Sequence, residues 1–254
     1  MSPDELVWLY AVRLAGAEGA PAGPGVDGEA PRLVAEAELA AVVGTVAAGR
    51  FDEAGMAAAM EDLGRLEQLA RAHHDVVVRA AAEVPVAPVR LATLYRDDDA
   101  VRRLLRERAE EFAALLRRVG GHREWGVKVY ALPQEEREPA AAPAASTDRP
   151  GTAYLFRRRA ERDRGARSRE QARDAAERLH TTLAGRSSAA HRYPMQDARL
   201  SGRTEEMVLN AGYLVADGRE AEFRDAVDAA DDGRVRVELT GPWPAFSFTT
   251  WEEP

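Results

Sequence analysis

The spacing of apolar residues predicts three strands and a long helix in the first third of the chain. Short apolar runs at 6–14, 32–35 and 39–46 have the length of strands. From 52 to 83, apolar residues recur every three or four positions, which predicts an amphipathic helix. The expected apolar stripe of this helix consists of Met56, Met60, Leu63, Leu66, Ala70, Val77 and Ala81.

Residues 84–132 are expected to complete a first domain. The β-rich stretch 84–95 contains two prolines, which favours an edge strand over a central one. Asp97 or Asp98 is a candidate N-cap for a second amphipathic helix that ends near Val119, and 125–132 alternates as a final strand. This order predicts an α+β sandwich of ferredoxin-like type, with helices on one face of a mainly antiparallel sheet.

The second half of the chain predicts another α+β domain. Residues 152–183 are compatible with a helix but poorly amphipathic, and such a polar helix projects from its domain or pairs with a partner. Strands at 207–216 and 234–240 flank a short helix at 220–230.

The expected division falls at 133–150. This stretch reads PQEEREPAAAPAASTDRP, with four prolines and no periodic apolar pattern, which is typical of a linker. The predicted organisation is therefore an N-terminal ferredoxin-like domain at 1–132, a Pro- and Ala-rich linker at 133–150, and a C-terminal α+β domain with a long polar helix at 151–254.

Composition and charge narrow the classes of function. The 254 residues include no cysteine, which excludes disulfides, thiolate zinc sites, iron–sulfur clusters and cysteine nucleophiles. A net charge of −8 disfavours binding to nucleic acid. The apolar stretch 39–48 is too short to span a bilayer, and 1–5 does not resemble a signal peptide, so we expect a cytoplasmic protein that does not bind membrane lipid.

The sequence predicts no catalytic residue, no cofactor site and no metal site. The glycines between 16 and 28 do not match a phosphate-binding loop. His73 and His74 are adjacent, so their side chains diverge by about 100° on a helix and cannot chelate one metal ion. Acidic residues at 97–99 stand at a helix start, where they favour capping over cation binding.

An arginine-rich helix is the first of two candidate partner surfaces. Nine arginines and five acidic residues lie between Arg157 and Arg178. Intrahelical pairs on a charged helix face explain such a pattern, and a surface for an acidic partner is the alternative. The candidate residues for partner binding are Arg157, Arg158, Arg162 and Arg169.

The segment 240–248, with sequence TGPWPAFSF, is the second candidate surface, through Trp243 and Phe246. Aromatic residues concentrate binding energy at interfaces, which favours a docking site. Alternatively, the segment closes the C-terminal domain, with Gly241 in an unusual turn and Trp243 in the core. We favour this structural interpretation because the segment continues the alternating strand at 235–239.

Seven short motifs stand out along the chain: LYAV at 9–12, ARAH at 70–73, PVAPVR at 85–90, GVKV at 126–129, GTAYL at 151–155, AGYLV at 211–215 and LTGPWPAFSF at 239–248. Together they resemble the gas vesicle protein GvpL/GvpF family over nearly the whole chain, and the last motif is the most specific. Members of that family often have Phe-Gly where this chain has Leu91-Ala92, and Pro-Tyr where it has Ala245-Phe246.

The resemblance implies a non-enzymatic accessory protein of gas vesicle formation, located in the cytoplasm or on the vesicle. It also implies a modified ferredoxin-like N-terminal domain and a C-terminal domain with coiled-coil-like helices. The implied partners are the small hydrophobic shell protein GvpA and other accessory Gvp proteins, which this protein would bind during vesicle nucleation. A minor structural component of the vesicle wall is the alternative.

Overall fold

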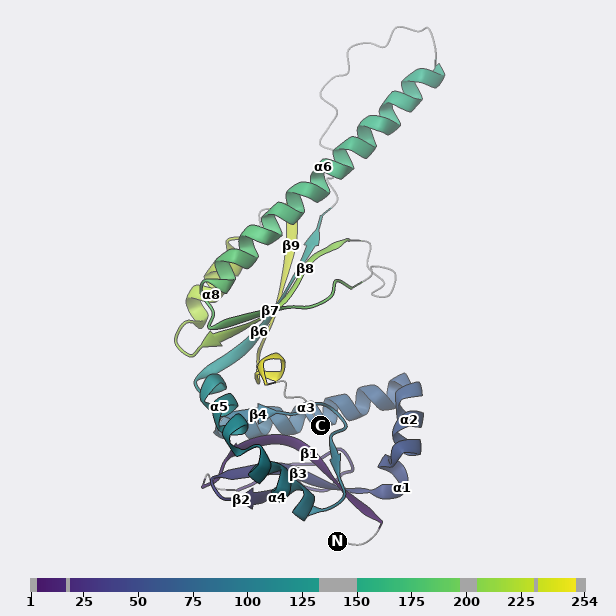
Figure 1. Ribbon diagram of the computed structural model, residues 1–254. Helices are drawn as coiled ribbons and strands as arrows, with labels where there is room; N and C mark the ends of the chain where they lie inside the picture. The colour runs from purple at the N-terminus through teal and green to yellow at the C-terminus, as the bar shows by residue number, and fades with distance from the viewer. Residues whose placement is uncertain (1–3, 17–18, 133–149, 197–204, 231–232, 250–254) are drawn as a thin grey trace. The chain divides into compact units, whose positions relative to one another are not determined.

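The computed structural model of the protein describes residues 4–16, 19–132, 150–196, 205–230 and 233–249 (Figure 1). The described chain combines helices with two antiparallel sheets, which confirms the predicted α+β class. Apart from its last residue, the predicted linker lies outside the described residues.

The chain divides into two units, each with its own sheet. The first unit comprises 1–124 and 242–254, and the second comprises 125–241. These bounds differ from the expected division at 133–150. The alternation of apolar and polar residues at 125–132 predicts a strand, but it does not indicate which of the two sheets the strand joins.

The first sheet has the strand order β2-β3-β1-β4. Its strands are β1 (Glu5–Leu14), β2 (Arg32–Glu36), β3 (Leu39–Ala47) and β4 (Val86–Pro88), and the short β5 (Leu94–Tyr95) also pairs with β1. The proline-containing β4 pairs only with β1, which confirms the edge strand expected there.

Helices cover both faces of the first sheet. One face packs against α1 (Ala48–Phe51), α2 (Glu53–Glu61) and α3 (Leu63–Glu83). The opposite face packs against α4 (Asp98–Glu107) and α5 (Ala109–Val119). The expectation of helices on one face is therefore wrong, since the central strand β1 is buried on both sides. On β1, Val7, Leu9 and Val12 point to one core, and Trp8, Tyr10 and Ala11 point to the other.

The single helix expected at 52–83 is interrupted at Asp62. This residue has extended backbone angles, and its side chain accepts hydrogen bonds from the backbone N–H groups of Gly64 and Arg65. It thereby caps α3, as Asp52 caps α2. The break shifts the helical phase, so the expected stripe is also wrong: Met60 and Leu63 are exposed, and the face that α3 buries consists of Leu69, His73, Val76, Val77 and Ala80.

The second sheet has the order β7-β8-β6-β9. Its strands are β6 (His122–Ala131), β7 (Ala189–Arg192), β8 (Met207–Ala216) and β9 (Val235–Trp243). Thus β6, expected as the last strand of the first domain, pairs instead with β8 and β9. Sequence reasoning missed β7, which contains no large apolar residue.

Helices α6 (Pro150–Ala184) and α8 (Glu220–Asp228) pack against the second sheet, and together with its strands they form the core of the second unit. The longer, α6, runs along the sheet and continues past it, with α8 nearby (Figure 1). Helix α6 continues without a break through Gly165. Among the side chains of α6 that the structure describes, those in the core, Ala172, Ala176, Leu179 and Leu183, lie in its C-terminal part. The predicted long polar helix is confirmed.

Candidate functional site

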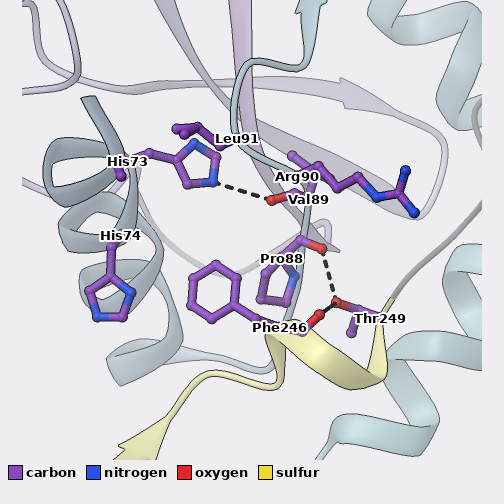
Figure 2. Close-up of a pocket in the computed structure, with 9 residues that line it drawn as sticks. His73, His74, Pro88, Val89, Arg90, Leu91, Phe246 and Thr249 are labelled. Atoms are coloured by element: carbon purple, nitrogen blue, oxygen red, sulfur yellow. Dashed lines mark hydrogen bonds between the residues drawn. The ribbon is translucent and has the colours of Figure 1, made fainter. Parts of the chain in front are cut away.

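A cavity of about 320 Å³ lies in the first unit, where three segments meet (Figure 2). Helix α3 contributes Ala70, His73 and His74. The second segment is 88–91, at the end of β4, and the third is the C-terminal segment 242–249, which contributes Phe246 and Thr249. The cavity is therefore built from residues that are far apart in the sequence.

Hydrogen bonds hold the C-terminal segment against the rest of the first unit. The backbone N–H and the hydroxyl of Ser247 both donate to the carboxylate of Glu124, which is buried. The hydroxyl of Thr249 donates to the carbonyl of Pro88 over 3.0 Å (Figure 2). Gly241 precedes the segment with a φ of +118°, which a residue with a side chain rarely adopts, so the unusual backbone expected at Gly241 is confirmed.

His73 forms part of the cavity wall and is a structural residue. Its Nδ1 accepts a hydrogen bond from the indole N–H of Trp8 over 2.9 Å. The proton of the neutral ring is therefore on Nε2, which lies 3.2 Å from the carbonyl oxygen of Val89 and donates to it. Burial lowers the pKa of His73 to about 4, so the ring is neutral at pH 7.

His74, the next residue, lies among aromatic side chains near the surface. The ring of Phe246 stacks on it at a centroid distance of 5.4 Å, and Trp243 meets it edge to face at 5.2 Å. The side chain of Trp243 is 40% exposed. This cluster brings together the two aromatic candidates, Trp243 and Phe246, beside the cavity.

The expectation that Trp243 fills the core of the C-terminal domain is wrong. Strand β9 continues through Trp243, but the residues that follow Gly241 belong to the first unit. Phe248, and not Trp243, is the buried aromatic residue of this segment. Removing Trp243 is therefore not expected to cost the 3–5 kcal/mol typical of a buried large aromatic residue.

The arginine candidates lie on α6, in the second unit, so they are not part of the cavity. Arg158 and Arg162 are exposed, whereas the side chain of Arg157 lies outside the described part of the chain. The guanidinium of Arg169 is 4.0 Å from the carboxylate of Glu206, which also pairs with Arg173. An ion pair within the chain thus explains the charge of Arg169 without a partner.

Sequence reasoning missed the residues of 88–91 that line the cavity. The signal next to them is Ala92, which has a φ of +66°. A non-glycine residue in this left-handed region is uncommon and marks a special turn.

Replacing Ala92 with glycine is expected to raise the free energy of unfolding by up to about 1 kcal/mol. The left-handed conformation costs an L-residue about 1–2 kcal/mol, of which the extra entropy of unfolded glycine cancels about 0.5–1 kcal/mol. Urea denaturation measures the change. Ala37→Gly, where φ is +51°, should also raise the free energy of unfolding. Ala81→Gly, within α3, should instead lower it by about 1 kcal/mol. A lower urea midpoint for Ala92→Gly than for wild type would contradict the inference that Ala92 is strained.

The described residues contain no cluster of three or more His, Asp or Glu side chains arranged to hold a metal ion. Among the same residues, no helix has both the length and the apolar character needed to cross a membrane.

The fold is shared with solved structures of gas vesicle proteins. The crystal structure of GvpF from Anabaena sp. PCC7120 is similar with a TM-score of 0.69 and 15% sequence identity, covering 98% of each chain. The crystal structure of GvpF from Microcystis aeruginosa gives a TM-score of 0.66 and 16% identity, covering 97% of this chain and 99% of that one.

Sequence comparison identifies the family directly. Gas vesicle protein L of Streptomyces sp. (strain CB03234) is 45% identical over 253 residues, which cover 98% of this chain and 94% of that protein. Gas vesicle protein F of the same strain is 27% identical over 75% of this chain and 81% of that protein. The sequence profile described as "Gas vesicle synthesis protein GvpL/GvpF" matches residues 6–250. The chain therefore belongs to the gas vesicle GvpL/GvpF family.

Proposed function

We propose that this chain is an accessory protein that binds the small hydrophobic shell protein GvpA, together with other Gvp proteins, while a gas vesicle nucleates. Its family implies a role in gas vesicle formation. The observation that carries the proposal is the cavity of the first unit, beside which Trp243 remains 40% exposed. A shell protein exposes apolar surface before it polymerises, and a partner that covers this surface prevents premature aggregation.

A binding protein fits these observations better than an enzyme. The matched family is described by its part in gas vesicle synthesis and not by a reaction. Two of the polar side chains that line the cavity, His73 and Thr249, are engaged in hydrogen bonds that hold the fold together. The chain is more similar to gas vesicle protein L than to gas vesicle protein F of the same Streptomyces strain, which supports a role like that of protein L.

Pull-down of the purified protein against each vesicle component separately tests this proposal. We expect capture of the shell protein and no measurable affinity for duplex DNA. If the shell protein is never captured, the proposal is wrong. Stoichiometric retention of the chain in purified, washed vesicles would favour instead a minor structural component of the wall.

The salt dependence of capture distinguishes the two candidate surfaces. Above about 0.15 M salt, where the screening length is about 8 Å, contacts between exposed charges weaken. Because the cavity is mostly apolar, we expect capture to persist at about 0.5 M salt, with only a modest loss. The triple variant Arg158→Gln, Arg162→Gln, Arg169→Gln should bind like wild type. Loss of capture in this variant would assign the contact to α6.

A further inference from the structure

We infer that the cavity of the first unit holds a large apolar side chain from an amphipathic helix of the partner, with a carboxylate of the same helix at Arg90. This binding mode rests on the proposed capture of the shell protein, and it specifies the surface used and the kind of segment that fits it.

The size and the walls of the cavity favour a single apolar side chain as the occupant. Ligand pockets range from about 300 to 1,000 Å³, so a cavity of about 320 Å³ is at the small end of that range. Ala70, Leu91 and Phe246 contribute apolar wall. The polar side chains of His73 and Thr249 are already hydrogen-bonded within the unit. An apolar occupant therefore leaves none of these polar groups without a partner.

Arg90 gives the cavity a preference for negative charge. It is exposed, and its side chain forms no hydrogen bond or ion pair with any other described residue. No acidic side chain is among the residues that line the cavity in the described part of the chain. A guanidinium binds a carboxylate through charge-assisted hydrogen bonds, whereas it repels a cation. The partner is thus expected to carry Asp or Glu near its apolar anchor residue.

A partly exposed and mostly apolar row on α3 extends the surface away from the cavity. Leu63, Leu66, Ala70 and His74 are spaced by three, four and four residues, so they share one face of the helix. Leu63 is 79% exposed, and Ala70 and His74 also line the cavity. At 1.5 Å per residue, this row is about 16 Å long, which is three turns of a helix. A row of this kind accommodates an amphipathic helix that inserts one anchor residue in a neighbouring cavity.

Two exposed substitutions test this binding mode in the full chain against the purified shell protein. Ala70→Trp fills the mouth of the cavity, and Arg90→Glu reverses the charge at its edge. Each should weaken capture at least about tenfold, because truncating or blocking a central anchor commonly costs more than 1.4 kcal/mol of binding. The matched controls are Leu14→Trp and Arg103→Glu, two exposed positions outside the surface, which should bind like wild type. Circular dichroism melts verify that all four variants fold.

A charge swap completes the test. In the shell protein, each Asp and Glu is replaced in turn with Arg. The Arg90→Glu variant of this chain should capture one of these shell-protein variants as wild type captures the unchanged shell protein, because the new ion pair restores the contact with reversed charges. If wild type captures the shell protein but Ala70→Trp and Arg90→Glu do so equally well, the binding mode is wrong while the proposed function stands. Failure of wild type itself overturns the proposed function. Self-association of the chain that Ala70→Trp abolishes would make a second copy the occupant and overturn the inference.

Discussion

Lowering the pH from about 7 to about 4 is expected to cost the first unit about 3 kcal/mol of unfolding free energy through His73 alone. Burial lowers the pKa of this imidazole to about 4 in the folded protein, whereas the ordinary value is 6.5. Between these two values, the unfolded state binds a proton that the folded state does not. The contribution is therefore complete above pH 6.5 and is lost as the pH falls towards 4.

The hydrogen bonds of His73 explain why the folded state resists protonation. Its Nδ1 must stay without a proton to accept from the indole N–H of Trp8, and a second proton would place two N–H groups face to face. The ring is only 3% exposed, so water cannot replace the lost bond. A charged imidazole at this position would be buried among the aromatic rings of Trp8 and Tyr10.

The variant His73→Gln isolates this effect from the titration of carboxylates. At pH 7 its free energy of unfolding should be about 1–3 kcal/mol lower than that of wild type. A glutamine side chain cannot accept from Trp8 and donate to Val89 with the geometry of the imidazole ring. Near pH 4 its stability should approach that of wild type, since nothing at position 73 then titrates. Urea denaturation across pH 4–7 measures both curves. If the free energy of unfolding changes with pH in the same way for wild type and His73→Gln, His73 is not the source of the pH dependence.

Sequence pattern predicted the strands of the first sheet because each is a short apolar run with its own boundaries. The same local reasoning failed where polar residues decide the structure. Asp62 interrupts the helical pattern by capping α3, although nothing in the apolar spacing marks a break there. Strand β7 was missed because it is mostly exposed and carries no apolar alternation.

The cavity was beyond local reasoning because its parts come from segments far apart in the sequence, within 70–91 and 246–249. The hydrogen bond from Thr249 to Pro88 joins residues 161 positions apart. Sequence reasoning identified Trp243 and Phe246 as a pair from their composition, and the structure brings both to His74. It placed Trp243 in the core of the C-terminal domain, since alternation extends β9 to Trp243 but does not show that the residues after Gly241 belong to the first unit.

Replacing Phe223 with alanine is expected to destabilise the second unit by about 3–5 kcal/mol. This residue of α8 is fully buried, and its ring lies 5.4 Å from that of Tyr213 and 6.3 Å from that of Trp125. Truncation removes the aromatic contacts and leaves a cavity that a sheet and a helix cannot close without strain. Because a domain has only about 5–15 kcal/mol of stability in total, the loss should be visible as a large drop in denaturation midpoint.

The neighbouring substitution Arg224→Ala is the matched control. Arg224 is exposed, and its guanidinium lies 5.7 Å from the ring of Trp125, so its removal should cost about 1 kcal/mol or less. The core that contains Phe223 is separate from the two cores of the first sheet, which places the damage in one unit. Hydrogen exchange should therefore accelerate in β8 and in the buried part of α6, while β1 and β3 keep their protection. Equal acceleration in both sheets would show that the two units unfold as one, and the independence inferred from their separate cores would then be wrong.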